Sequence, residues 1–171
     1  LRDQIPNFLK NKNFNCEIKI VDDGKSILGT GGGILNMLNH CNENDFLVIN
    51  PDTVWKDEYL GEITKMKELY FSQKIKNILL LVKKDLSFDE NLKGDFNLNN
   101  NLILQNSKKD FIYVGCQILN KGLFSAYKVN NFSITKIWNN LINKKKLYGF
   151  ESHNNFYHLT NLEIFKKLKD L

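Results

Sequence analysis

Residues 46–52 read Phe-Leu-Val-Ile-Asn-Pro-Asp, and this stretch decides the fold. Its first four residues are all apolar, which is typical of a strand buried on both faces. Residues 59–72 then show helical periodicity, and residues 78–83 form another strand-length apolar run. A strand, a helix and a strand in this order predict the βαβ unit of a largely parallel sheet covered by helices. We therefore expect an α/β fold.

The segments on either side extend this prediction. Upstream, we expect a short helix at residues 5–9, a strand at 17–21, and a turn at Gly31-Gly32-Gly33 that leads into a helix at 34–38. Downstream, we expect a β region with strands at 94–98, 102–105 and 111–119. Ser133 is expected to cap one helix, and Thr160-Asn161-Leu162-Glu163 reads as the capping box of the last.

Composition narrows the function classes. At 171 residues, of which 42% are hydrophobic, the chain suits a single domain spanning residues 1–171. No stretch approaches the ~20 apolar residues of a membrane span, and the first residues do not resemble a secretory signal. The net charge of +5 comes from scattered lysines, which does not favour nucleic acid. Three widely spaced cysteines favour a reducing cytoplasm over disulfides or a zinc site, and nothing indicates the oligomeric state.

Asp52 is the best candidate for a metal ligand. It comes directly after a buried strand, and ligands of open α/β sheets collect at the carboxyl ends of the strands. A carboxylate at that position is suited to holding Mg²⁺ against a phosphate. The alternative is that Asn50, Pro51 and Asp52 only form a turn.

Thr30-Gly31-Gly32-Gly33 is a candidate nucleotide contact. Residues without side chains allow a base or ribose to approach the backbone, and a following helix offers unpaired N–H groups. The stretch is not a Walker loop, because no Lys-Ser/Thr follows it. A glycine-rich turn without a ligand remains the alternative.

These residues resemble the sugar-1-phosphate nucleotidylyltransferases. The resemblance rests on Leu28 to Ile34 and on Phe46 to Asp52 with Trp55, and ordered matches continue along nearly the whole chain. The further matching stretches are Lys93 to Phe96, Tyr113 to Leu119, Phe132 to Trp138, Leu147 to Gly149, and Tyr157 to Glu163. Within this family the chain looks most like N-acetylmuramate α-1-phosphate uridylyltransferase, an activity of cell-wall recycling.

The resemblance implies a Rossmann-like fold with a mostly parallel mixed sheet, and a reaction that joins a nucleoside triphosphate and a sugar-1-phosphate with release of pyrophosphate. It gives Asp52 a catalytic role through Mg²⁺, and the turn from Thr30 to Gly33 a role in holding the nucleobase and ribose. It gives Gly94, Asp95 and Gly115 a place on the sugar side. His158 stands where many relatives carry a second metal-binding Asp. For Asp95, capping a turn is an equal alternative.

The sequence also departs from the family pattern. Thr160-Asn161-Leu162 replaces Gly-Thr-Pro, and Gly29 stands where relatives often carry an acidic residue. Relatives begin with a strand and a glycine-rich, arginine-containing loop that cradles the triphosphate, and this chain is expected to start downstream of both. Loss of the cradle should remove most activity, because phosphoryl transfer depends on positioning and charge neutralisation. Loss of the strand should leave apolar surface and an unpaired sheet edge exposed.

Other functions remain open at this stage. The alternatives are a mannose-1-phosphate guanylyltransferase, a choline-phosphate cytidylyltransferase, or a degenerate module that binds a nucleotide or sugar without catalysis. His40 and His153 are expected at the surface. Phe150, Phe156 and Tyr157 are expected in the core or in the wall of the sugar pocket.

Overall fold

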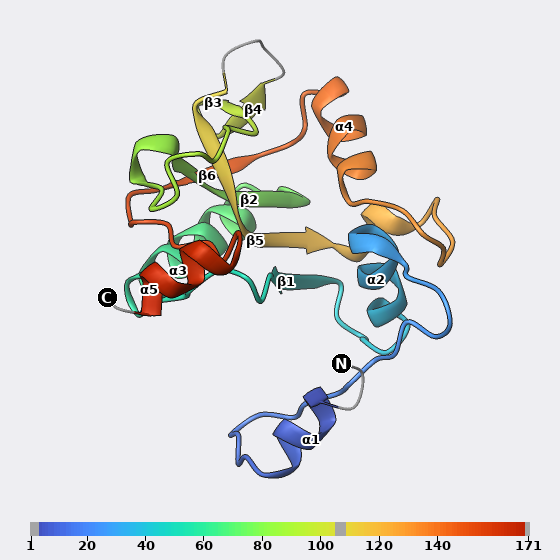
Figure 1. Ribbon diagram of the computed structural model, residues 1–171. Helices are drawn as coiled ribbons and strands as arrows, with labels where there is room; N and C mark the ends of the chain where they lie inside the picture. The colour runs from blue at the N-terminus through green and yellow to red at the C-terminus, as the bar shows by residue number, and fades with distance from the viewer. Residues whose placement is uncertain (1–3, 105–108, 170–171) are drawn as a thin grey trace.

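The computed structural model describes residues 4–104 and 109–169. Its elements follow one another along the chain as shown in Figure 1. They are α1 (Gln4–Lys10), α2 (Gly29–Leu38), β1 (Asp45–Ile49), α3 (Glu58–Ser72), β2 (Asn77–Lys83), the 3₁₀ turn η1 (Lys84–Leu86), β3 (Asn97–Asn99), β4 (Leu102–Leu104), β5 (Phe111–Asn120), the 3₁₀ turn η2 (Lys121–Phe124), α4 (Thr135–Asn143), β6 (Gly149–Ser152) and α5 (Leu162–Lys169). None of the helices in this described part is long and apolar enough to cross a bilayer.

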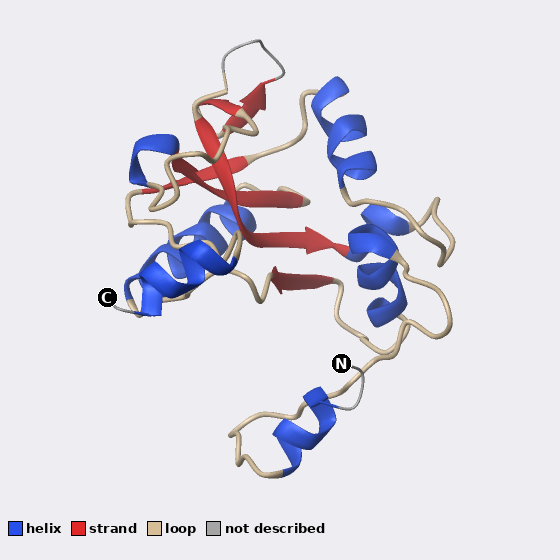
Figure 2. Ribbon diagram, viewed as in Figure 1, coloured by secondary structure: helices blue, strands red, loops and turns tan. Residues whose placement is uncertain are grey.

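The central sheet has the order β1-β5-β2-β6 (Figure 2). Strand β5 runs antiparallel to both β1 and β2, while β2 and β6 are parallel. Strands β1, β2 and β6 therefore share one direction, and only β5 opposes them. Strands β3 and β4 form a separate antiparallel pair. This arrangement confirms the expected α/β fold with a mostly parallel mixed sheet.

Helices cover both faces of the sheet because β2 is apolar on both sides. Leu79 and Leu81 belong to the core cluster that includes α2 and α4. Ile78, Leu80 and Val82 belong to the opposite cluster, which includes α3. Successive side chains of a strand point to opposite faces, so one continuous apolar run fills two cores.

A β-bulge interrupts the pairing of β2 with β5. Leu79 pairs with Gln117, whereas Leu81 pairs with Tyr113, so β5 uses extra residues over this step. Gly115 lies within the bulge at φ +86°, and its amide oxygen accepts a hydrogen bond from the Asn50 amide (2.7 Å). A Cβ at Gly115 would lie 2.8 Å from the Asn50 Cβ. The bulge therefore brings β5 against the residue that follows β1.

The strand predicted at residues 17–21 was wrong. These residues form no regular secondary structure and are largely exposed, and no described strand pairs with them. A strand needs a neighbouring strand that completes its backbone hydrogen bonds. An alternating pattern of side chains does not provide such a neighbour. Strand β1 likewise has one edge that pairs with no other described strand, and its Leu47 and Ile49 are exposed.

Further predictions need smaller corrections. The strand predicted at 94–98 is β3, at Asn97–Asn99, and Gln105, the predicted end of β4, lies outside the described residues. The predicted glycine turn is helical, since α2 already begins at Gly29. The last helix is capped by Asn161, whose Oδ1 accepts from the Ile164 amide (3.0 Å), and not by Thr160. Ser133 was expected to cap a helix, but the N-cap of α4 is Ile134, which makes no side-chain cap hydrogen bond. The Ser133 hydroxyl accepts from the Thr135 amide (3.3 Å) one residue before that cap.

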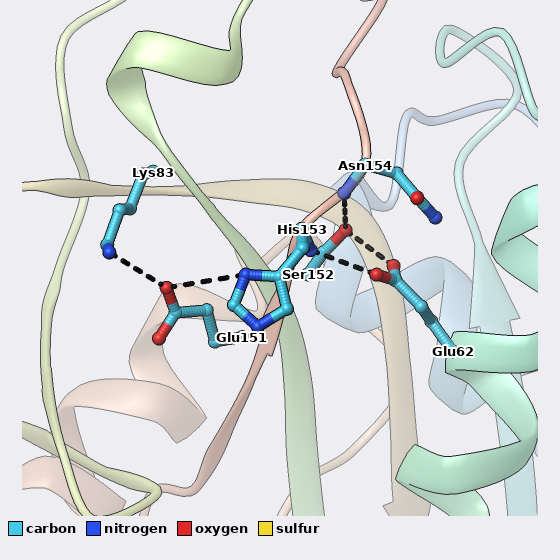
Figure 3. Close-up of polar contacts among 6 residues, drawn as sticks. All are labelled: Glu62, Lys83, Glu151, Ser152, His153 and Asn154. Atoms are coloured by element: carbon cyan, nitrogen blue, oxygen red, sulfur yellow. Dashed lines mark hydrogen bonds and ion pairs between the residues drawn. The ribbon is translucent and has the colours of Figure 1, made fainter.

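Strand β6 was not predicted, and α3 fixes its end (Figure 3). Glu62 of α3 accepts hydrogen bonds from the Ser152 hydroxyl (2.5 Å) and the His153 amide (2.9 Å). Lys83 at the end of β2 pairs with Glu151 (3.2 Å). These contacts hold the carboxyl ends of β2 and β6 side by side. The His153 ring itself is exposed, as is His40, which confirms the expected surface positions.

Substituting two glycines should have opposite effects on stability. We expect Gly115→Ala to lower the free energy of unfolding by more than about 1 kcal/mol, because a side chain is strained at positive φ and would contact Asn50. Gly61→Ala should raise it by about 0.5–1 kcal/mol, because Gly61 is exposed within α3 and its Cβ would meet no atom. Urea unfolding measures both. Equal effects of the two substitutions would contradict the assigned bulge.

Candidate active site

The carboxyl ends of three strands meet at one edge of the sheet. Because β1, β2 and β6 share a direction, the segments that follow them emerge on the same side. Asp52 follows β1, Asp89 follows β2 and its 3₁₀ turn, and His158 follows β6. An isolated bridge between Thr53 and His158 joins the first and third of these segments. Chain topology thus gathers residues that are far apart in the sequence.

Asp52 and His158, the two predicted metal ligands, lie next to each other. His158 Nε2 is 3.4 Å from Asp52 Oδ2. The backbone supports this contact, since the Leu159 amide donates to the Asp52 carbonyl oxygen (2.8 Å). Asp52 Oδ1 is buried and makes no hydrogen bond to the described residues. A buried carboxylate oxygen without a donor is costly unless another partner reaches it.

The donor set fits part of a divalent cation site. The described residues hold no group of three or more His, Cys, Asp or Glu side chains that could bind a metal ion. One carboxylate and one imidazole would supply two ligands. Mg²⁺ in phosphoryl-transfer enzymes is often held by only one or two protein carboxylates, and waters and phosphate oxygens of the substrate complete its coordination.

A cavity of about 510 Å³ lies beside this edge, between the start of α2, the end of β1 and the start of α4. Val48, Ile49 and Asn50 line it from β1, and Asn50 is two residues before Asp52. Its wall is mostly apolar, with a few polar groups, as is typical of ligand sites. Asp52 and His158 are not among the lining residues. The cavity and the Asp52–His158 pair are thus neighbours along one strand end.

Gly31 and Gly32 are closely packed, whereas Gly33 is not. The amides of Gly31 and Gly32 both donate to the Phe132 carbonyl oxygen, at 2.9 and 3.2 Å. A Cβ would lie 2.3 Å from the Phe132 ring at Gly31 and 2.0 Å from the Asn130 carbonyl oxygen at Gly32. These two glycines therefore serve the packing of α2, and their amides already have partners.

Thr30 and Gly33 line the cavity, as does Gly29. A Cβ at Gly33 would approach nothing closer than Asp23 Oδ1, at 3.9 Å, so its surface is open. The Thr30 hydroxyl accepts from the Ile134 amide (3.0 Å) and ties α2 to the start of α4. Gly29 has φ +66° and its Cβ would lie 2.8 Å from the Phe132 carbonyl oxygen, so backbone geometry excludes an acidic residue there.

The three residues predicted on the sugar side have evident packing roles. A Cβ at Gly94 would lie 2.0 Å from the Lys109 carbonyl oxygen. Asp95 Oδ2 accepts from the Tyr113 amide (2.9 Å) and so ties the loop to β5. Desolvation raises the pKa of Asp95, although this hydrogen bond lowers it in part. Gly115 occupies the bulge. None of the three lines the 510 Å³ cavity.

Tyr113, Gln117 and Trp138 line the cavity and were not predicted as site residues. Trp138 Nε1 donates to Gln117 Oε1 (3.1 Å), and the Tyr113 and Trp138 rings meet edge to face. The Tyr113 hydroxyl is buried and makes no hydrogen bond of ordinary geometry within the described part of the chain. Burial above all, then the nearby Cys116 and Asp52, raise its pKa, which Gln117 lowers only in part. Tyr113 and Gln117 carry polar groups four positions apart within the otherwise apolar run of β5, and this was the available signal.

Comparisons with known proteins identify the fold. No family model and no curated protein matches the sequence. Among solved structures, HddC from Yersinia pseudotuberculosis complexed with GMP-PN is similar with a TM-score of 0.69 and 22% identity, over 97% of this chain and 72% of that one. A putative glucose-1-phosphate thymidylyltransferase from Bacillus anthracis has a TM-score of 0.65 and 17% identity, over 83% of this chain and 60% of that one.

UDP-glucose pyrophosphorylase is also similar, with a TM-score of 0.62 and 16% identity, over 85% of this chain and 60% of that one. At these identities the likeness concerns the fold. The chain has the α/β fold that HddC, the thymidylyltransferase and UDP-glucose pyrophosphorylase share.

Proposed function

We propose that this chain is the larger part of an enzyme that transfers a nucleoside monophosphate from UTP to N-acetylmuramate 1-phosphate and releases pyrophosphate. The observation that carries the proposal is that the end of strand β1 lines the cavity and leads directly to Asp52. Val48 and Ile49 of β1 and the following Asn50 line the 510 Å³ cavity, and Asp52 comes two residues after Asn50, beside His158. A nucleotide in the cavity would have its phosphates near that pair.

The open surface of Gly33 is suited to a base or ribose. In the proposed arrangement the base stacks over Gly33 and beside the apolar wall, and Thr30 joins α2 to the start of α4 through its hydrogen bond with the Ile134 amide. Gly31 and Gly32 act indirectly, by fixing α2 against residues 130–132. Gly94, Asp95 and Gly115 are proposed to shape the sugar side through the loops and the bulge that they stabilise.

Asp52 and His158 are proposed to hold Mg²⁺ or a similar divalent ion. Such an ion, when bound, neutralises charge that develops on the phosphate oxygens. The exposed half of the Asp52 side chain (49%) leaves room for a substrate phosphate, while its buried Oδ1 keeps a lone pair without a donor. The residues of this chain thus orient the phosphates. An oxygen of the sugar phosphate attacks the α-phosphorus in line, the bond to the β-phosphate oxygen breaks, and pyrophosphate leaves.

A triphosphate-binding segment upstream of Leu1 is part of the proposal. It follows from the family resemblance, in which a strand and a glycine-rich loop precede the matched residues. One edge of β1 pairs with no strand among residues 4–104 and 109–169, and together with the exposed Leu47 and Ile49 it leaves a place for a further strand. Reading the coding sequence upstream of Leu1 for an in-frame glycine-rich motif with an arginine tests this part directly.

A guanine nucleotide is the second candidate donor, because HddC was solved with GMP-PN. Competition among UTP, GTP and CTP for binding separates the two candidates. Preference for UTP supports the proposal, and preference for GTP favours the guanylyltransferase alternative.

The glycine run provides a matched pair of substitutions. Gly33→Ala should weaken UTP binding about tenfold while leaving unfolding stability unchanged or higher, because its methyl group would project into the cavity. Gly32→Ala should instead lower stability by more than about 1 kcal/mol, since its methyl group would contact the Asn130 carbonyl oxygen. Calorimetric titration with UTP and urea unfolding measure the two effects. Normal UTP binding by a folded Gly33→Ala variant would exclude the cavity as the base site.

Asp52 provides the test of the reaction itself. In protein that includes the upstream coding sequence, we expect release of pyrophosphate that depends on Mg²⁺. Asp52→Asn should lower kcat on the order of 10²-fold, because it removes an electrostatic contact made through the ion. Asp57→Asn is the control, since Asp57 is exposed at the start of α3 and outside the site. Near-normal turnover of Asp52→Asn would show that Asp52 is only a turn residue.

A further inference from the structure

Gln117 is a buried polar residue in the wall of the 510 Å³ cavity. The residue is only 2% exposed, and it lines the cavity from β5. It pairs with Val48 on one side and with Leu79 on the other, and directly opposite residues of antiparallel strands point to the same face. That face is the one covered by α2 and α4, since Leu79 belongs to their core cluster. The amide of Gln117 therefore meets the cavity between these two helices.

The indole of Trp138 determines which end of this amide is free. Trp138 Nε1 lies 3.1 Å from Gln117 Oε1. Because an indole N–H can only donate a hydrogen bond, the amide oxygen must face it and the NH₂ group must point away.

The NH₂ group of Gln117 has no acceptor of its own. Its Nε2 makes no hydrogen bond of ordinary geometry to any described residue, and the neighbouring Tyr113 hydroxyl accepts none. A buried amide donor without an acceptor is costly, and an oxygen of a bound ligand would remove that cost. The cavity thus presents a donor that is held in one orientation.

The proposed position of the phosphates determines which edge of a base would reach Gln117. The phosphates are proposed to lie near Asp52, and Val48, the partner of Gln117 in the sheet, stands four residues before Asp52. A base over Gly33 then has its ribose towards Asp52 and its opposite edge towards Gln117. On that edge uracil carries O4 and guanine carries O6, which are acceptors, whereas cytosine and adenine carry amino groups, which are donors.

We propose that Gln117, oriented by Trp138, is a specificity-determining residue that selects a keto base, uracil or guanine, over an amino base, cytosine or adenine. The NH₂ group of Gln117 donates to O4 or O6 of a keto base. Opposite the amino group of cytosine, two donors would meet and both would stay without an acceptor. The inference rests on the proposed function, because it takes the cavity as the base site, and it deepens that function by disfavouring the cytidylyltransferase alternative.

Calorimetric titration with UTP and CTP tests the selection in protein that includes the upstream coding sequence. The two nucleotides carry the same ribose and triphosphate, so the ratio of their affinities reports on the base alone. We expect UTP to bind about tenfold or more tightly than CTP, because one buried donor without an acceptor is worth about that much. Equal affinities for UTP and CTP would overturn the inference without any variant.

Two substitutions separate the roles of the amide and the indole. Gln117→Met keeps the length of the side chain but has no donor, so the preference for UTP should fall about tenfold. Trp138→Phe removes the indole N–H and allows the amide to turn, so that Oε1 can accept from the amino group of cytosine. The preference should fall in this variant too. Gln73→Met is the control, since Gln73 is exposed at the end of α3 and should keep the parent preference.

The outcome for the inference is distinct from that for the proposed function. A folded Gln117→Met or Trp138→Phe variant that prefers UTP as strongly as the parent protein contradicts the assigned role of that side chain. Absence of pyrophosphate release from a protein that prefers UTP over CTP, and loses this preference in both variants, counts against the proposed function alone.

Discussion

The contact between Gly115 and Asn50 is the constraint on which the candidate site depends. It places the bulge of β5 against the end of β1, where the Asn50 amide donates to the Gly115 carbonyl oxygen (2.7 Å). Strand β5 lies between β1 and β2 and runs antiparallel to both. Strands β1 and β2 are therefore parallel to each other, and both end at the same edge of the sheet. Tyr113 and Gln117 flank the bulge and line the cavity together with Asn50, and Asp52 follows Asn50 by two residues. A side chain at position 115 would move all of these groups together.

The sequence was most informative where one segment determines its own structure. The apolar runs of β1, β2 and β5 and the periodicity of α3 predicted those elements to within a residue or two. Prediction failed for segments whose secondary structure depends on a partner that is distant in the sequence. Residues 17–21 alternate like a strand but have no described neighbour, whereas β6, at Gly149–Ser152, is a strand because β2 lies beside it and Glu62 fixes its end. The local sequence pattern does not indicate such distant partners.

In the candidate site too, local features could be predicted from the sequence and long-range contacts could not. Asp52 could be predicted because a carboxylate directly after a buried strand has a position dictated by the strand, and His158 followed from the family resemblance. Their contact depends on the pairing of Thr53 with His158, a long-range feature. The glycine run suggested ligand contact throughout. Positions 31 and 32, however, have no room for a side chain because residues 130–132 pass close to them. Thr160 looked like a helix cap, but Asn161 takes that role and leaves the Thr160 hydroxyl to His158.

The central claim is that the cavity and the Asp52–His158 pair form one nucleotide site. Titration of the ¹⁵N-labelled chain with UTP and Mn²⁺ tests it most directly, because Mn²⁺ broadens signals near the ion while the base shifts signals near the cavity. The account predicts that His158 broadens and that the Gly33 and Asn50 amides shift at the same ratio of ligand to protein. Broadening of His158 with no response at Gly33, or a shift at Gly33 that leaves His158 sharp, would contradict a single site.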